Sequence, residues 1–534
     1  MLYLKSRKGS QKGFCSLIGL LVFASTLLTG CGKDNTFKNK EITMEAFSDM
    51  KAPAFVFDYA QMMQLVGEMA HNTPATIEAD RRVRDYYTQA DAQLLWIDRA
   101  GVDSRADSLL SHLLQVSDIG FSEQTFFVDV IKKDIQRLRQ LQFGEGLEDI
   151  NHVATRLEYY LTKACMRYAY GYRYGFINPS RIFNRLDEEE KKPGESSRYV
   201  RYRGLFDMDM EQAPADYHLT VINKIVHDSI AGYLTSIEPQ NSFYKQLKGM
   251  LKNATTDEQR KRIICNMERT RWRLHHPIPE KGKRIIVNLP AYHLYAYGAD
   301  SVLDMRIVCG AWKTKTPLLA SEVEWMEVNP QWIIPKSILE KDVVRHAGDS
   351  AYFARNKYKI FERETNQQME IGEVTQAMLL SGKYRVAQES GDDNSLGRIV
   401  FRFKNQFSVF LHYTSTPWVF QRDSRSISHG CVRVERPFEL ANFVLDQPDE
   451  WLLDRIRISM GLRPATDRGR NYLRTHRDHE GDHKLIGYVP VKPHVPLYII
   501  YFTLWPDETG ALQTWPDIYG YDRVILEHLN LYLP

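Results

Sequence analysis

Hydrophobic positions recur with helical spacing through the first half of the chain. Between about Arg81 and Ile264, apolar side chains return every three or four residues, as at Ala106, Leu109 and Leu113. This spacing places them on one face of an α-helix. We predict helices at 106–114, 157–174, 242–251 and 257–273. No chemically reactive residues cluster in this half, so a helical scaffold is the expected role.

The pattern changes at Lys283, where short apolar runs rich in β-branched and aromatic residues begin. Such runs, bounded by turn residues, predict β-strands. They fall at 284–289, 293–297, 305–309, 322–329, 399–403 and 489–504. A further run at 407–411 predicts a buried strand that ends at His412. The fold class is therefore α+β, with an N-terminal helical scaffold followed by a β-rich domain.

The N-terminus has the pattern of an export signal. Four Lys and Arg residues in the first twelve positions precede an apolar stretch at 14–28, which is too short for a transmembrane helix. The sequence Leu28-Thr29-Gly30-Cys31 resembles a bacterial lipobox, which implies that residues 1–30 are removed and that Cys31 carries lipid. A plain signal peptide or signal anchor is the alternative. We expect an exported protein, held to a bacterial membrane by its lipid and facing the periplasm.

The length of 534 residues predicts two to four structural units. After the signal, we expect a tether at 31–80, the helical scaffold at 81–282 and the β-rich domain at 283–534. A charged segment at about 336–388 interrupts the last domain and is too long for an ordinary loop. We expect this insertion to act as a lid.

Composition excludes several classes of protein. Hydrophobic residues make up 43% and charged residues 26%, as in a folded globular protein. A net charge of +3, without a basic patch carrying interleaved aromatics, argues against nucleic acid as a partner.

Cysteine spacing argues against a zinc ribbon or a redox pair. Beyond the signal and the lipobox, the chain keeps Cys165, Cys265, Cys309 and Cys431, with no C-x-x-C motif. Cys165 and Cys265 lie in helical apolar patterns, so we predict that they are buried and inert.

Cys431 has the surroundings of a nucleophile. It lies in the run Ser428-His429-Gly430-Cys431-Val432-Arg433, just before a predicted helix, with His412 nineteen residues upstream. An imidazole near a thiol can generate the reactive thiolate. Gly430 lets the backbone bend, so the N–H groups of Gly430 and Cys431 are candidates for an oxyanion hole. Arg433 would face the same side as Cys431 and favour the thiolate or hold a substrate carboxylate.

A metal site is the competing interpretation. His412, His429 and Cys431 lack a convincing fourth ligand. A second group, His476, His479 and His483, lies in a charged stretch that predicts a solvated loop. We therefore expect neither a metal nor an organic cofactor.

The cysteine run, preceded by His412, resembles the signature of the L,D-transpeptidases with a YkuD-type catalytic domain. Other segments resemble the large YcbB-like subgroup of that family. They lie at 95–121, 161–179, 284–294, 305–310, 329–341, 394–397, 501–505 and 517–520. The resemblance covers about 94–522, and the cysteine run is its most specific part.

The resemblance implies that Cys431 attacks the carbonyl between meso-diaminopimelate and the terminal D-Ala of a peptidoglycan stem. The acyl group then passes to the side-chain amine of a second stem. It implies that His412 is the base, that His429 and Ser428 line the site, and that Arg433 occupies a position where relatives carry Arg or Asn. It also implies that carbapenems acylate the cysteine.

Several alternatives stay open at this stage. Water as the acceptor would make the protein an L,D-carboxypeptidase, and a vestigial site would make it a non-enzymatic lipoprotein. Tyr413 and Trp418 either line the stem-peptide groove or pack in the fold. The sequence also departs from the subgroup, because only about 252–264 separates the scaffold from the next matching segment, where relatives commonly carry a peptidoglycan-binding module. The lipobox replaces the transmembrane anchor that relatives commonly have.

Overall fold

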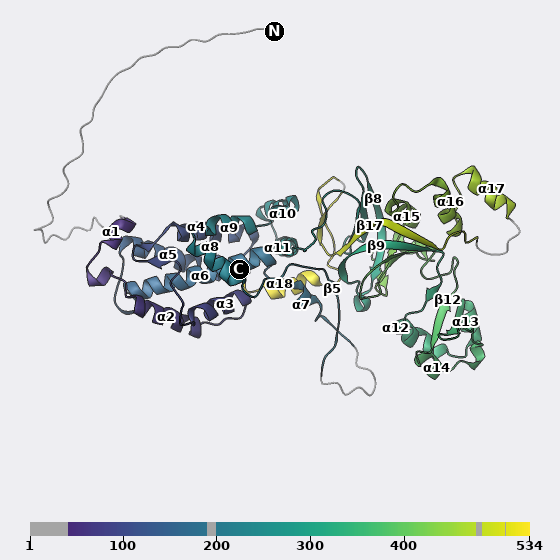
Figure 1. The fold of residues 1–534 in the computed structure, drawn as a ribbon, viewed down its shortest axis with the longest axis horizontal. Coiled ribbons are helices and arrows are strands. Elements are labelled where there is room, and N and C mark those ends of the chain that lie inside the picture. Colours follow the sequence, from purple (N-terminus) through teal and green to yellow (C-terminus); the bar gives the residue numbers. More distant parts are fainter. Residues whose placement is uncertain (1–40, 190–198, 477–482, 508) are drawn as a thin grey trace, which may run out of the picture.

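A helical region and a β-rich region lie end to end in the computed structural model (Figure 1). The structure describes residues 41–189, 199–476, 483–507 and 509–534. The predicted export signal and Cys31 lie outside the described residues. Within these ranges, no helix is both long enough and apolar enough to cross a bilayer.

The helical region confirms the predicted helices and adds others. Its helices are α1 (Met44–Ser48), α2 (Tyr59–Asn72), α3 (Glu78–Tyr87), α4 (Ser104–Leu113), α5 (Val128–Gln140), α6 (Ile150–Tyr174), α7 (Pro179–Phe183), α8 (Tyr217–Val226), α9 (Ile230–Ile237), α10 (Ser242–Lys252) and α11 (Asp257–Arg271).

Helix α6 is the axis of this region. The Asp149 carboxylate accepts the N–H of His152 at 2.9 Å and caps the first turn, and Gly175, with φ of +89°, ends the helix. Its side chains are buried on nearly every side, so neighbouring helices surround it. One charge in this core is paired, since Arg167 donates to both oxygens of Asp80 at 2.7 and 2.6 Å.

The predicted tether at 31–80 is wrong for the part that the structure describes. Helix α2 lies in the scaffold core, where Met62, Val66 and Ala70 are fully buried. These residues recur at four-residue intervals and form one helical face. The folded scaffold therefore begins near position 43, well before 81.

The β-rich region is a ten-stranded sheet in the order β13-β14-β16-β8-β7-β6-β17-β9-β5, with β15 paired to β8. Because β13 also pairs with β9, the sheet closes on itself. The strands are β5 (Phe206–Asp207), β6 (Arg284–Asn288), β7 (His293–Tyr297), β8 (Val302–Gly310), β9 (Leu318–Val328), β13 (Ile399–Phe403), β14 (Leu411–His412), β15 (Ser426–Ser428), β16 (Val432–Val434) and β17 (Tyr488–Ile500).

The flanking elements complete this region. They are the helices α15 (Pro437–Val444), α16 (Glu450–Ser459), α17 (Asp467–Thr475) and α18 (Tyr521–Leu529), and the hairpin of β18 (Leu504–Pro506) with β19 (Leu512–Thr514). The predicted α+β class is confirmed.

The division at 282/283 does not separate the two regions. Strand β5 comes from the scaffold and pairs in parallel with β9. In the other direction, the C-terminus returns to the scaffold, where Tyr532 is buried against Phe121, Phe126 and Phe176 (Figure 1). Periodicity reports local structure, so it does not reveal either exchange.

The insertion is a small subdomain with its own core. Its sheet joins β10 (Trp332–Ile333), β12 (Tyr384–Gln388) and β11 (Tyr358–Glu362), and the helices α12 (Lys336–Ile338), α13 (Ser350–Arg355) and α14 (Gln376–Leu380) cover it. Phe353 and Ile360 are fully buried there, in a cluster separate from the main core. Its role as a lid stays a prediction.

Helix α11 joins the two regions although it is strongly polar. Glu268 and Arg271 are completely buried and pair at 3.1 Å. The guanidinium of Arg271 also lies 5.3 to 5.7 Å from the ring centroids of Phe121, Tyr172, Phe176 and Tyr244. A charge is tolerated at such a place only when partners compensate for its lost hydration.

Candidate active site

His412 and Arg433 lie on one face of two adjacent strands, and Cys431 directly precedes the second of them. Strands β14 and β16 pair in parallel, with His412 opposite Arg433 and Leu411 opposite Val432. Because side chains alternate along a strand, His412, Arg433 and Cys431 point to the same side. Leu411 and Val432 point to the other side and are fully buried. The pairing thus brings the predicted thiol, imidazole and guanidinium together.

The predicted strand at 407–411 is mostly a loop. The side chain of Asn405 takes over backbone hydrogen bonds there. Its Oδ1 accepts the N–H groups of Phe407 and Val409 at 3.0 and 3.1 Å, and its Nδ2 donates to the Val409 carbonyl at 2.8 Å. A short polar side chain can compete with a strand ladder in this way. Only Leu411 and His412 remain as strand.

This loop lies next to the nucleophile. Ser408 has a φ of +55°, which is uncommon for a residue with a side chain. Its carbonyl oxygen lies 3.9 Å from Sγ of Cys431 and accepts the thiol hydrogen. The loop therefore holds the resting thiol in a defined direction.

Ser428 and Gly430 shape the turn before Cys431. Gly430 has a φ of +117°, which favours glycine. The Ser428 hydroxyl donates to the Cys431 carbonyl at 2.6 Å and accepts the Gly430 N–H at 3.2 Å. We therefore assign Ser428, which is 3% exposed, to support of the turn and not to contact with a substrate. Because the Gly430 N–H is used, the Cys431 N–H remains as the oxyanion donor; no described residue accepts from it. The predicted helix does not follow directly, since β16 intervenes.

Thr316 and Tyr519 fix the position of this turn through buried hydrogen bonds. The sequence pattern predicted no role for either residue. The Thr316 hydroxyl donates to the Gly430 carbonyl at 2.8 Å and accepts the Gly310 N–H at 2.9 Å. The Tyr519 hydroxyl donates to the Gly310 carbonyl at 2.6 Å and accepts the Thr316 N–H at 3.2 Å. Both side chains are buried. The only earlier signal was the resemblance of segment 517–520.

The network continues to the scaffold. The Tyr519 N–H donates to the Tyr501 hydroxyl at 2.8 Å, which donates to Asp517 at 2.6 Å. Asp517 accepts the N–H of Asp522 at 2.9 Å, and Asp522 pairs with Arg269 of α11 at 2.6 Å. A buried polar chain thus links the scaffold to the nucleophile turn.

His412 is neutral and held in one tautomer. Its Nδ1 lies 2.5 Å from the Tyr413 carbonyl, which can only accept, so Nδ1 carries the hydrogen of the neutral ring and Nε2 is the nitrogen without one. Burial lowers the pKa of His412 to about 4, and the positive charge of Arg433 adds to this effect. Backbone hydrogen bonding to Tyr413 and Leu396 raises the pKa of the ring, but less than burial lowers it. The group that orients His412 was not predictable, because a backbone carbonyl leaves no mark in the sequence.

The resting thiol is also neutral. Burial raises the pKa of Cys431, while a backbone hydrogen bond from Phe410 and the charges of Arg402 and Arg433 lower it. The raised pKa means that the thiol is protonated near neutral pH. Attack on a carbonyl therefore needs the proton to move to Nε2 of His412 as the bond to sulfur forms.

Arg402 is a further candidate residue of the site, which the strand pattern did not predict. It lies on β13 and pairs with both oxygens of Glu327 at 3.1 and 3.0 Å. Its guanidinium carbon lies 4.1 Å from the ring centroid of Phe410. It therefore supports the backbone beside Cys431 and favours the thiolate electrostatically.

The other predicted site residues lie at the rim. His429 is exposed on the turn, and Trp418 is 62% exposed on a short helical segment, η10 (Pro417–Gln421). Tyr413 is partly buried against the small cluster of Val308, Val419 and Phe420, so it packs in the fold.

Among the described residues, the remaining cysteines and histidines form no second site. Cys165, Cys265 and Cys309 are fully buried free thiols, as predicted for the first two. No group of three metal-ligating side chains occurs in the part of the chain that the structure describes. His476 stacks on Tyr472, with ring centroids 4.1 Å apart, and His479 lies outside the described residues.

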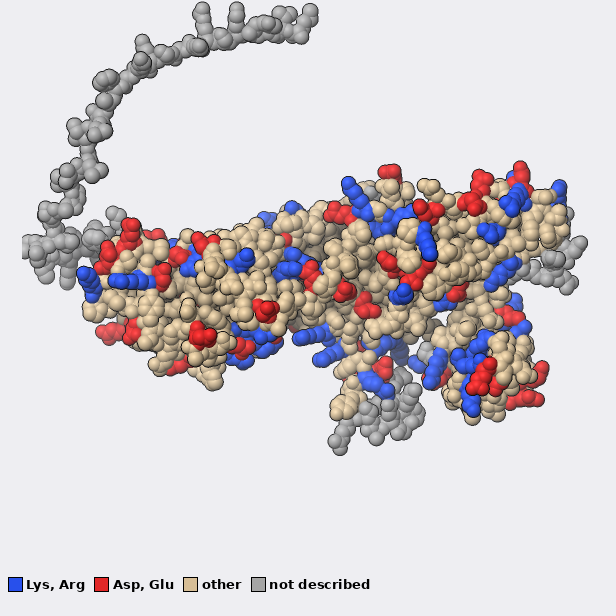
Figure 2. Space-filling view, viewed as in Figure 1, with Lys and Arg blue, Asp and Glu red and all other residues tan. Residues whose placement is uncertain are grey.

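The scaffold also touches the loops beside the nucleophile. Its hairpin of β3 (Asp187–Glu188) and β4 (Tyr202–Arg203) reaches the loop before β9, where Asp187 accepts from Lys315 at 2.6 Å and Arg203 donates to the Lys313 carbonyl at 2.9 Å. A Cβ at Gly204 would lie 2.9 Å from the Phe407 ring. The insertion projects from one side of the molecule, below the sheet in Figure 2.

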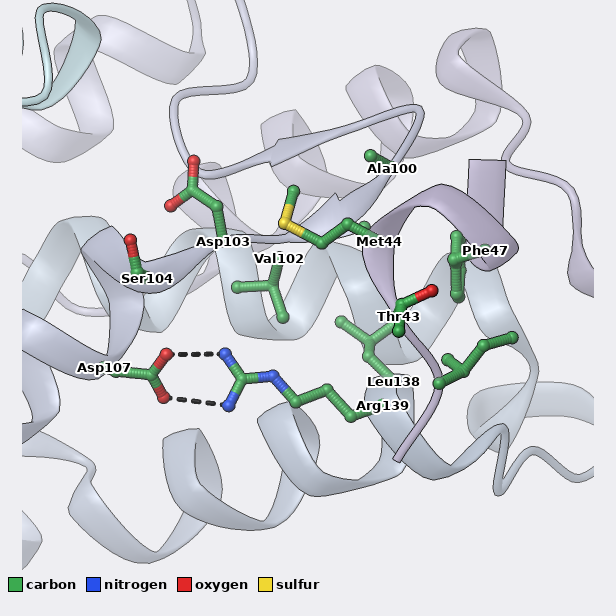
Figure 3. Close-up of a pocket in the computed structure, with 12 residues that line it drawn as sticks. Thr43, Met44, Phe47, Ala100, Val102, Asp103, Ser104, Asp107, Leu138 and Arg139 are labelled. Carbon is green, nitrogen blue, oxygen red and sulfur yellow. Dashed lines mark hydrogen bonds and ion pairs between the residues drawn. The ribbon is translucent and has the colours of Figure 1, made fainter. Parts of the chain in front are cut away.

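A cavity of about 320 Å³ at the far end of the scaffold is separate from this site (Figure 3). Its charged side chains are paired, because Arg139 donates to both oxygens of Asp107 at 2.9 and 2.6 Å and Arg105 donates to Asp103 at 2.7 Å. None of the residues around Cys431 lines it. The catalytic chemistry therefore does not extend to this cavity.

Comparisons with known proteins agree with the predicted resemblance. Residues 282–484 match the family YkuD, described as the L,D-transpeptidase catalytic domain, and residues 81–251 match a family described as the scaffold domain. A Haemophilus influenzae protein (strain ATCC 51907 / DSM 11121 / KW20 / Rd) named "Putative L,D-transpeptidase" is 26% identical over 321 residues, which are 59% of this chain and 60% of that protein. Residues 282–484 are therefore similar to an L,D-transpeptidase catalytic domain and residues 81–251 to its scaffold domain, which confirms the predicted resemblance.

The low pKa of His412 predicts a pH dependence of stability. Because the pKa is about 4 in the fold and ordinarily about 6.5, the unfolded chain binds more protons between these values. The free energy of unfolding should therefore fall as the pH is lowered, by about 2 kcal/mol from pH 7 to pH 5. His412→Gln should not show this pH-dependent loss of stability, whereas His429→Gln, which removes an exposed imidazole, should still show it. Hydrogen exchange of the backbone amides in β14 and β16 reports unfolding, and its comparison at the two pH values measures the difference in stability. Equal pH dependence in the native protein and His412→Gln would contradict this account.

The turn network predicts a difference between two substitutions at Thr316. Thr316→Val removes the hydroxyl and leaves buried backbone groups unsatisfied, which costs about 1–3 kcal/mol and should slow D-Ala release from a disaccharide-tetrapeptide about tenfold or more. Thr316→Ser keeps the hydroxyl and should stay within about threefold of the native rate. Similar rates for the two variants, at equal melting temperature, would show that the Gly430 carbonyl does not need this bond.

Proposed function

We propose that the protein is a peptidoglycan L,D-transpeptidase with Cys431 as nucleophile and His412 as general base. The observation that carries the proposal is the parallel pairing of β14 with β16, which sets His412 opposite Arg433. Cys431 directly precedes β16, and alternation along the chain turns its side chain to the same side as Arg433. The match to the L,D-transpeptidase catalytic domain supports it.

The first half-reaction forms a thioester. Sγ of Cys431 attacks the carbonyl carbon of the diaminopimelate residue that precedes D-Ala, while Nε2 of His412 takes the thiol proton. The Cys431 N–H donates to the oxygen that becomes negative. When the amide C–N bond breaks, His412 returns the proton to the D-Ala amine, which leaves.

The second half-reaction transfers the acyl group. After D-Ala has left, His412 is neutral again. The side-chain amine of a second stem then attacks the thioester carbonyl and gives a proton to His412. The C–S bond breaks, the sulfur recovers its proton, and the third residues of two stems are joined. No cofactor takes part, because the thioester divides one difficult step into two easier ones.

Arg433 is suited to hold a carboxylate of the donor stem. It is partly buried, its Nη1 makes only a long hydrogen bond of 3.4 Å to Thr414, and its buried Nε has no hydrogen-bond partner among the described residues. Stem peptides carry free carboxylates close to the scissile bond. A planar guanidinium two residues after the nucleophile can bind such a group with two parallel hydrogen bonds.

Product analysis tests the assignment. The protein is incubated with a disaccharide-tetrapeptide and the products are followed by mass spectrometry; we expect D-Ala and cross-linked dimers. Cys431→Ala should lower turnover by about 10³-fold or more, because the covalent route is lost, whereas Cys165→Ala, in the distant helix α6, should keep the same products. Disaccharide-tripeptide as the sole product would identify water as the acceptor and an L,D-carboxypeptidase. Full activity of Cys431→Ala would remove the assignment.

We also propose that the protein is exported and held to a membrane through lipid on Cys31, facing the periplasm where peptidoglycan lies. The lipobox-like sequence at 28–31 supports this proposal. Mass spectrometry of the N-terminal peptide, after expression in a Gram-negative host, should find Cys31 as the first residue with a diacylglycerol thioether. A different first residue, or an unmodified Cys31, would contradict the anchor.

A further inference from the structure

A second cavity, of about 480 Å³, lies in the scaffold, away from Cys431. It is bounded by the start of α3, the end of α6, α7 and the segment at 212–215. The polar and aromatic residues that matter to its chemistry are Arg81, Arg82, Arg181, Tyr174, Asn178 and Gln212.

The charges of this cavity are predominantly positive. Three arginines line it, and Glu78 is the one acidic residue in its lining. Arg81 donates to one oxygen of Glu78 at 3.2 and 2.8 Å, and Nε of Arg82 lies 2.8 Å from the other oxygen. The guanidinium of Arg181 has no hydrogen-bond or ion-pair partner in the described part of the chain. An anionic group therefore fits this cavity, and Arg181 is free to bind it.

The rest of the lining suits a sugar with an amide substituent. Tyr170, Tyr174 and Phe176 supply aromatic surface, on which a pyranose ring can pack. Asn178 donates to Oε1 of Gln212 at 2.7 Å and accepts the Arg181 N–H at 3.1 Å, so it holds the exposed Gln212 amide in place, and the Gln212 Nε2 group is left as an amide donor. Apolar surface with a few convergent polar groups is typical of a small-ligand site.

The wall of the cavity continues to the nucleophile loop. Arg181 lies on α7, and Asn184, directly after α7, accepts the N–H groups of Leu205 and Phe206 at 2.8 and 2.9 Å. Gly204, the residue directly before Leu205, lies against Phe407, which precedes Ser408. α3, α7 and β5 follow one another along the same side of the molecule (Figure 1), and Lys and Arg side chains gather there (Figure 2).

Nothing in the structure provides a separate module between scaffold and sheet. The whole stretch from 252 to 284 is described; it holds α11 and an extended segment before β6, and no further domain. A protein that acts on a polymer gains affinity from a second binding site.

We propose that this scaffold cavity binds a peptidoglycan repeat next to the one being processed. The aromatic and amide side receives an N-acetylated sugar, and Arg181 receives a carboxylate of the attached stem. This inference rests on the proposed function for the identity of the polymer.

Binding to purified, insoluble peptidoglycan sacculi tests the inference. The full chain in detergent carries Cys431→Ala, so that no acyl transfer takes place, and co-sedimentation gives the Kd. Adding Arg181→Glu should raise the Kd about tenfold or more, because a charge-assisted contact becomes repulsive. The matched control is Arg260→Glu, an exposed arginine of α11 that does not line the cavity. It should change the Kd less than about twofold.

Two outcomes would overturn the inference: an unchanged Kd for Arg181→Glu, or an equal loss in both variants. Competition separates the two parts of the ligand. Glycan strands freed of peptide should compete for the native cavity, and competition by free tetrapeptide alone would overturn the sugar assignment. Tyr174→Ala should weaken the competition by glycan strands, and no change there would also contradict it. Because these experiments use inactive protein, failure of the proposed acyl transfer would show in product analysis and not here.

Discussion

The nucleophile turn depends on one buried hydrogen bond, from the Thr316 hydroxyl to the Gly430 carbonyl. Buried backbone groups must be satisfied, so this bond fixes where the turn can sit. Thr316 is in turn held by Tyr519, and Tyr519 is linked through Tyr501, Asp517 and Asp522 to α11. Such a network specifies a single arrangement only when every member has its partners. The scaffold is therefore part of the structure that orders the catalytic turn.

Burial of the site also sets the protonation states of its side chains. It keeps the His412 imidazole and the Cys431 thiol neutral, although Arg402 and Arg433 lie nearby. A neutral pair carries no desolvation penalty at rest, and charge appears only when the thiol attacks. Fixed donors then have their largest effect, because they face a charge that did not exist in the ground state.

The sequence predicted the parts of this architecture that have a local pattern. Helix and strand periodicity located α6, β6, β7 and β13, and the motif around Cys431 with His412 predicted residues that the pairing of β14 with β16 brings together. It could not predict the loop at 404–409, because one asparagine side chain there replaces a strand ladder. Nor could it predict the Tyr413 carbonyl, since every residue has one. Thr316 and Tyr519 are 203 positions apart, and contacts over that distance have no local pattern.

These long-range contacts also explain why the boundary at 282/283 has little physical meaning. A chain cut there would lose β5 from the edge of the sheet and the contacts of Arg203 with the loop before β9. It would leave Asp522 without Arg269 and Thr503 without Asn266, in surroundings that exclude water. An unpaired buried charge costs several kcal/mol, roughly 3–5, which is a large fraction of the stability of a domain. The region matched at 282–484 is thus continuous in sequence similarity but not independent in folding, and the scaffold affects the candidate site through the positions that it enforces.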